Sequence, residues 1–307
     1  MNFDELETEK RNPVTGMIDK MTVSDLLMVI QQEDEKVSLA VKKALPEIAA
    51  AVEQITSALR HGGRLFYVGA GTSGRLGVLD AAECPPTFNA PADLVQALIA
   101  GGTDAMFTAV EGAEDNYEQG GRDLRERNLS AADVVVGIAA SGRTPYVIGA
   151  LHFADSLGCR TIAVTCVREA ELSKVAALTI AVPVGPEVIA GSTRMKAGTA
   201  QKMILNMLST ATMIQLGKTY GNLMVDVKAT NAKLAARVRR IVQEAAEVDE
   251  TVAAETIKQA NGSAKVAIVM LLGKISADSA VRTLEASHGS VRQALVMAKS
   301  MRTGESS

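Results

Sequence analysis

The chain has 307 residues, of which 47% are hydrophobic, and its formal net charge is −3. This length is enough for about two domains, and the slightly acidic balance argues against a nucleic-acid partner. The three cysteines and three histidines show no metal-ligand spacing, so we expect no metal, no cofactor and reduced thiols in a cytoplasmic protein. No signal-peptide pattern and no apolar stretch of membrane-spanning length is found, so we expect no membrane partner.

The first sixty residues predict an arm followed by helices. Residues 1–20 are polar and are expected to form an extended arm. Ser24 is a suitable cap for a helix over 25–32. A second helical pattern covers 36–59, and Pro46 is expected to break it.

Five short apolar runs then alternate with helical patterns. Continuous apolar runs of this kind are typical of strands buried on both faces of a parallel sheet. They cover residues 65–68, 94–99, 134–138, 161–164 and 178–182. The pattern predicts an α/β fold with a doubly wound five-stranded parallel sheet in the strand order 2-1-3-4-5.

The rest of the chain is helical in pattern. A long helix rich in Met and Leu is expected over 197–216, and helices continue from about residue 231. We therefore predict three parts: N-terminal arm and helices over 1–50, the sheet domain over 51–222, and a small all-helical domain over 223–307.

The loop after the first predicted strand is built to hold an anion. Residues 69–75 read Gly-Ala-Gly-Thr-Ser-Gly-Arg. Glycines let the backbone approach an anion closely, and the helix that should start here offers unpaired N–H groups. We predict that Thr72, Ser73 and Gly74 bind phosphate.

The same loop matches the GxGxxG pattern of dinucleotide-binding enzymes. Those folds need an acidic residue near the end of the second strand to hold the ribose hydroxyls. Here the first carboxylate after that strand is Asp104, beyond two glycines and a threonine. NAD binding is therefore the disfavoured alternative.

A second loop repeats the construction. Residues 139–145 contain Ser141 and Thr144 and precede another helical pattern. In the expected sheet, the loops after strands one and three line one crevice. Each hydroxyl alone is also an ordinary helix cap, but together the loops favour one phosphate monoester on a polyol.

Five motifs together resemble the N-acetylmuramic acid 6-phosphate etherase family, cytoplasmic bacterial enzymes built on the sugar isomerase (SIS) domain and related to glucokinase regulatory protein. They lie at 69–77, 82–86, 111–115, 139–146 and 191–202. The resemblance implies a lyase of amino-sugar catabolism and peptidoglycan recycling. It would eliminate D-lactate from N-acetylmuramic acid 6-phosphate and add water at C3, giving N-acetylglucosamine 6-phosphate, without a cofactor.

The resemblance also implies roles for carboxylates. Glu83 matches the proton donor to the departing lactate, and Glu114 matches the second catalytic carboxylate. Which of the two is acid and which is base stays open. Glu111 would share the pocket. The pattern alone would make Glu83 a helix-end residue and Glu114 part of a helix start.

Further charged residues are candidates for substrate binding. Glu187 lies in a segment similar to a loop of sugar isomerases, where either a pocket role or a structural role is open. Lys196 and Arg194 are candidates for neutralising phosphate or the lactyl carboxylate. Arg143 is another, since a guanidinium matches a carboxylate bidentately.

One distance restricts the site. In a straight helix, Glu83 lies about 15 Å along the axis from Ser73, farther than C3 of a hexose lies from its own 6-phosphate. Either the chain bends near Gly77 or a second subunit supplies Glu83. We favour a homodimer with composite sites.

Two other functions are compatible with the sheet domain. An aldose–ketose isomerase would use the same C2 proton without a leaving group. A non-catalytic sugar-phosphate sensor usually carries a helix-turn-helix domain, and residues 1–50 are too short and too weakly basic for one.

Overall fold

The computed structural model describes residues 7–227 and 232–303. Its backbone divides into two compact units. The first runs to Cys84 and resumes over Pro91–Thr210, and the second contains Pro85–Ala90 and the chain from Ala211 onward. No helix in the described ranges is long and apolar enough to cross a membrane. The three-part division stays a prediction.

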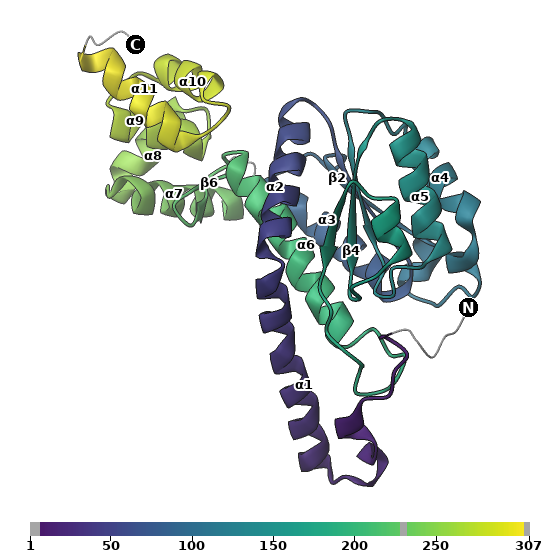
Figure 1. Cartoon of the computed structure of the whole chain (residues 1–307). Coiled ribbons are helices and arrows are strands. Elements are labelled where there is room, and N and C mark those ends of the chain that lie inside the picture. Colours follow the sequence, from purple (N-terminus) through teal and green to yellow (C-terminus); the bar gives the residue numbers. More distant parts are fainter. Residues whose placement is uncertain (1–6, 228–231, 304–307) are drawn as a thin grey trace. The chain divides into compact units, whose positions relative to one another are not determined.

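The first unit contains a five-stranded parallel sheet (Figure 1). Its strands are β1 Leu65–Gly69, β2 Val95–Ile99, β3 Val134–Ile138, β4 Arg160–Thr165 and β5 Leu178–Ala181. Their order is β2-β1-β3-β4-β5 and all pairs are parallel. Every residue of β1 and β3 is buried, as the continuous apolar runs predict. The predicted sheet and strand order are confirmed.

Helices cover both faces of this sheet. They are α2 Leu45–Arg60, α3 Gly71–Phe88, α4 Tyr117–Glu126, α5 Pro145–Ser156 and α6 Lys196–Gln215. Figure 1 shows α4 and α5 side by side on one face. Alternate residues of β1 serve the two faces: Phe66 and Val68 enter a core with α4 and α5, whereas Tyr67 contacts α3.

A buried polar cluster joins α3 to β1 and α6. The Tyr67 hydroxyl donates to Asp80 Oδ2 at 3.0 Å, and Asp80 Oδ1 accepts from Asn206 Nδ2 at 2.7 Å and Ser209 Oγ at 3.0 Å. Burial raises the pKa of Asp80 although all three donors act to lower it. These bonds fix the middle of α3 against the sheet.

The N-terminal helices differ from the sequence expectation. They are α1 Val23–Lys43 and α2 Leu45–Arg60. Thr22, not Ser24, caps α1, with its Oγ1 accepting from Asp25 N. The polar residues after Gln32 are good helix formers, so α1 continues through them. The break comes at Ala44, and Pro46 stands in the first turn of α2, where proline is tolerated.

The described part of the arm is anchored and is not extended. It contains short 3₁₀ turns at Pro13–Thr15 and Ile18–Lys20. Asn12 Nδ2 donates to Pro186 O at 3.2 Å, and Thr15 Oγ1 donates to Val188 O at 2.9 Å. The expectation of an extended arm was wrong because these side chains find backbone partners far along the chain.

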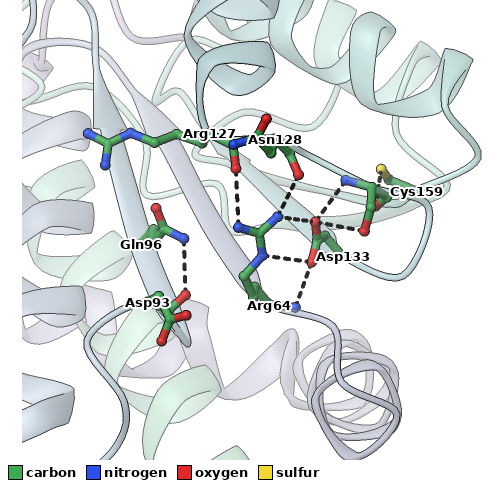
Figure 2. Close-up of polar contacts among 8 residues, drawn as sticks. Arg64, Asp93, Gln96, Arg127, Asn128, Asp133 and Cys159 are labelled. Carbon is green, nitrogen blue, oxygen red and sulfur yellow. Dashed lines mark hydrogen bonds and ion pairs between the residues drawn. The ribbon is translucent and has the colours of Figure 1, made fainter.

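An ion pair ties together the starts of β1 and β3 (Figure 2). Arg64 Nη2 lies 2.8 Å from Asp133 Oδ2, and Arg64 Nε donates to Oδ1 at 3.2 Å. The same carboxylate accepts from the backbone N–H groups of Arg64 and Ser130. Because Asp133 is 1% exposed, this network satisfies a buried charge at the sheet edge away from the glycine loop.

In its described residues, the second unit is helical apart from a short antiparallel ladder of β6 Thr219–Tyr220 with β7 Leu223–Met224. Its helices are α7 Ala232–Ala246, α8 Glu250–Gln259, α9 Ala264–Gly273, α10 Ala277–Ala286 and α11 Val291–Thr303. They surround one apolar core of their own. The helical C-terminal region is thus confirmed.

Candidate functional site

The glycine loop connects β1 to α3 in a turn that leaves no room for a Cβ at Gly69 or Gly74. Gly71 has φ +51°, in the left-handed region that favours glycine. A Cβ on Gly74 would lie 2.6 Å from Ile99 Cγ1 and 2.8 Å from the Gly69 carbonyl oxygen. The helix therefore starts against the end of the strand, with Thr72 and Ser73 in its first turn.

The second hydroxyl loop leaves the neighbouring strand at the same level. Gly69 of β1 pairs in register with Ile138 of β3, so the two loops start side by side. Thr144 is the N-cap residue of α5 and makes no side-chain capping bond there. Ser141, Arg143 and Thr144 are all half-buried. Both predicted phosphate loops thus begin at one edge of the sheet.

A third helix start lies nearby, but a carboxylate of the chain already occupies it. Glu187 accepts hydrogen bonds from the backbone N–H groups of Lys196 and Ala197, at 3.0 and 2.9 Å. Glu187 is 1% exposed, and burial raises its pKa against the lowering effect of these bonds. Its observed contacts are those of a helix cap.

Lys196 is also held by the interior of the protein. Its Nζ lies 2.6 Å from Glu33 Oε2, and both side chains are buried. Burial raises the pKa of Glu33, but hydrogen bonds from Lys196 and Lys36 outweigh it and lower the pKa overall. Arg194, in contrast, is exposed. Substrate binding by Lys196 stays a prediction. To contact a substrate, Lys196 would have to leave or share its contact with Glu33.

A cleft of about 310 Å³ opens beside the glycine loop. It is lined by residues 70–71, 75, 100, 105 and 109–114. The cleft brings Glu111 and Glu114 to Gly71, although some forty residues separate them. Glu114 lies in a 3₁₀ turn, Ala113–Asp115, just before α4. Both carboxylates are exposed and available to a bound molecule.

Glu83 lies away from this cleft. It is exposed and sits near the other end of α3, and it is not among the cleft-lining residues. The helix has no interruption at Gly77. It also runs through Pro85 and Pro86 to Phe88, so Glu83 is not at the end of the helix as the pattern alone suggested. The fixed proline φ is itself helical, although each proline loses its own N–H bond and its ring crowds the carbonyl of the residue four positions earlier.

Two residues without an assigned role also lie at this site. Arg75 lines the cleft, and its Nε donates to the Met106 carbonyl at 3.1 Å. Gln201 of α6 accepts a hydrogen bond from Ser73 at 2.9 Å. Arg75 is the last residue of the glycine loop at 69–75, so its position in the sequence could have indicated it. Gln201 lies in the motif at 191–202, but no local pattern could reveal its partner Ser73, which is 128 residues away.

The chain matches two family models. The model of the glucokinase regulatory protein N-terminal SIS domain covers residues 47–155, and the SIS domain model covers residues 116–211. An N-acetylmuramic acid 6-phosphate etherase from Actinobacillus pleuropneumoniae is 54% identical over 94% of this chain and 95% of its own length. One from Mycolicibacterium smegmatis is 54% identical over 96% of this chain and 99% of its own. The chain belongs to the N-acetylmuramic acid 6-phosphate etherase family.

The fold agrees with this etherase assignment. A phosphoheptose isomerase from Francisella tularensis superposes with a TM-score of 0.51 at 20% identity, covering 63% of this chain and 100% of that one. At that identity the likeness concerns the fold alone. It supports the SIS architecture of this etherase family member.

Proposed function

We propose that this protein is a carbon–oxygen lyase that cleaves the D-lactyl ether of N-acetylmuramic acid 6-phosphate. The products are N-acetylglucosamine 6-phosphate and D-lactate, in the catabolism of cell-wall amino sugars. The observation that carries the proposal is the cleft in which the phosphate-binding turn at Gly71 meets Glu111 and Glu114, in a chain of the etherase family.

The phosphate is proposed to bind at the start of α3. A helix N-terminus supplies unpaired N–H donors and a positive dipole end. Ser73 and Thr72 add hydroxyls, and Ser141 and Thr144 of the second loop add two more. Glu187 already fills the start of α6, which leaves α3 and α5 for the ligand. This arrangement suits a single phosphate group.

Elimination then requires a base at C2 and an acid at the ether oxygen. We assign the base to Glu114, because it shares the cleft with the phosphate turn. Its carboxylate takes the C2 proton of the open-chain aldehyde, the C2=C3 bond forms, and the C3–O bond breaks. The departing lactate oxygen takes a proton from Glu83. Water then adds across the double bond, its oxygen at C3 and a proton at C2.

The position of Glu83 favours a composite site in a homodimer. Since α3 is continuous from Gly71 to Phe88, Glu83 lies about 15 Å along the axis from Ser73. A sugar held at Ser73 is therefore out of reach of its own subunit's Glu83. A partner subunit would supply this acid, while Glu114 acts within the subunit that holds the phosphate.

The reaction is tested by incubation with N-acetylmuramic acid 6-phosphate in deuterated water. Lactate release with deuterium at C2 of the product is expected. Glu83→Gln and Glu114→Gln should each slow release by about 10²–10⁴-fold, as expected for loss of a general acid or base. Lactate release without deuterium at C2 refutes elimination. Turnover of fructose 6-phosphate in place of lactate release would favour an isomerase.

Subunit mixing tests the composite site. A mixture of Ser73→Ala and Glu83→Ala proteins should regain about one quarter of wild-type activity, because half of the dimers are mixed and each carries one intact site. The matched control is Ser73→Ala with Glu114→Ala, which should regain none since both residues serve the same site. Failure of the first pair, or recovery by both, contradicts the arrangement.

A further inference from the structure

A buried amide behind the phosphate-binding turn has an unused pair of donors. Gln201 is 1% exposed, and its Oε1 accepts the Ser73 hydroxyl at 2.9 Å. Within residues 7–227 and 232–303, its Nε2 is buried and has no hydrogen-bond partner. Such an unsatisfied group in an interior is rare and calls for an explanation.

Gln201 lies next to the turn because the first turns of α3 and α6 touch. A Cβ on Gly198 would lie 3.4 Å from Thr72 Cγ2, and Gln201 follows Gly198 by one helical turn. Ser73 is itself only 8% exposed. The hydrogen that the Ser73 side chain gives to Gln201 is the only one that its hydroxyl has.

This bonding pattern is unsuited to a phosphate. An anion needs Ser73 to donate, but its single hydrogen already points to Gln201. A half-turn about the Cγ–Cδ bond of Gln201 exchanges Oε1 and Nε2, two groups of nearly equal size. Nε2 would then donate to the Ser73 oxygen, and the Ser73 hydrogen would be free to donate to the anion. The bond from Nε2 to Ser73 would then strengthen the bond from Ser73 to the anion, because hydrogen bonds that point the same way along a chain polarise one another.

We propose that Gln201 is a positioning residue for Ser73, and that its amide reverses when a phosphate ester binds at the start of α3. The inference rests on the proposed function only in placing phosphate at that turn. Glutamine suits this task because its amide both accepts and donates. A carboxylate at the same position accepts only, and leucine does neither.

Titration calorimetry of the full chain with N-acetylglucosamine 6-phosphate tests this inference. Gln201→Leu should weaken binding about tenfold, the loss of one hydrogen bond to a charged network. Gln201→Glu should weaken it about a hundredfold, since it holds the Ser73 hydrogen and adds a like charge. In a Ser73→Ala background, Gln201→Leu should cause no further loss, because Gln201 acts through Ser73. The matched control is Thr56→Val, which removes a buried unpartnered hydroxyl from α2 and should leave affinity unchanged.

Additive losses in the double variant overturn the inference, as does unchanged affinity in Gln201→Leu or absence of binding by the wild type. Lactate release is not part of this measurement. Coupled losses in a protein that releases no lactate would therefore refute the proposed function and leave this inference standing. Lactate release together with additive losses would refute this inference and leave the proposed function standing.

Discussion

The buried ion pair of Lys196 and Glu33 allows the loss of stability in a Lys196 variant to be predicted. The two side chains are 1% and 3% exposed, and Nζ lies 2.6 Å from Oε2. Lys196→Met removes the cation and leaves the carboxylate in the interior. Removing one partner of a buried pair costs about 3–5 kcal/mol. Lys36 also contacts Glu33 from the surface, so we expect the lower end, about 3 kcal/mol.

Thermal unfolding followed by far-ultraviolet circular dichroism measures this loss, since the chain has no tryptophan for fluorescence. With an unfolding entropy of about 2.1 cal/mol/K per residue, a loss of about 3 kcal/mol corresponds to a fall in Tm of roughly 5 °C for 307 residues. The double variant Lys196→Met with Glu33→Leu should recover most of it, because an apolar pair of similar volume needs no charge partner.

The loss should depend on pH in a defined direction. Hydrogen bonds from Lys196 and Lys36 lower the pKa of Glu33 against the opposing effect of burial. Such a carboxylate stabilises the fold above its unfolded pKa, and that stability is lost as pH falls through the folded pKa. Without Lys196, burial favours the protonated form. The difference between wild type and Lys196→Met should therefore shrink from about pH 7.5 to about pH 5.

Two results would refute this reasoning: a loss below about 1 kcal/mol in the single variant, or no recovery in the double variant. The double variant also decides the role expected for Lys196 from the sequence. If it regains stability and still binds N-acetylglucosamine 6-phosphate as the wild type does, Lys196 is structural. If stability returns and binding does not, Lys196 contacts the substrate.

Three further substitutions test other parts of the fold. Gly74→Ala places a Cβ 2.6 Å from Ile99 Cγ1 and should cost about 1–3 kcal/mol of stability and also phosphate affinity; wild-type unfolding and binding would contradict the tight turn. Asp133→Asn should destabilise the sheet near pH 7. Arg64 and two backbone N–H groups hold the pKa of Asp133 low against burial, so the loss of stability should disappear in acid below that pKa, where the wild-type carboxylate is protonated. An equal loss near pH 7 and in acid would contradict this. Gly149→Ala places a Cβ 1.8 Å from the Tyr117 carbonyl oxygen. It should push α5 away from α4 and lower stability by more than about 3 kcal/mol. In the control Gly16→Ala, the new Cβ meets nothing closer than 4.0 Å, so this variant should unfold as the wild type does.

The sheet could be predicted from the sequence because its signals are local. Each strand is a short apolar run between polar or glycine-rich segments, and the order follows from general rules for parallel sheets. Two segments of the second unit, residues 261–263 and 288–290, also carry local signals, because each has a glycine followed by a serine. Asn261 and His288 have φ +51° and +50°, and each is followed by a left-handed glycine and a serine that caps the next helix.

Contacts between distant parts of the chain escaped prediction. Lys196 pairs with Glu33 across 163 positions, and Ser73 bonds Gln201 across 128. No periodicity or spacing marks such partners. The sequence made Lys196 a candidate for neutralising phosphate or the lactyl carboxylate, whereas its observed partner Glu33 lies in α1. Side-chain chemistry at the site was thus readable, but the interior partners were not.

The unbroken course of α3 has a consequence for how this family can vary. The helix carries the glycine loop, the proposed phosphate site, at one end and Glu83 near the other. One residue inserted between them would turn Glu83 by about 100° around the axis and shift it by about 1.5 Å. Side chains on the outer surface of the helix can be exchanged without that effect. Under the proposed assignment, natural selection would therefore preserve the length of this segment more strictly than its outward-facing residues.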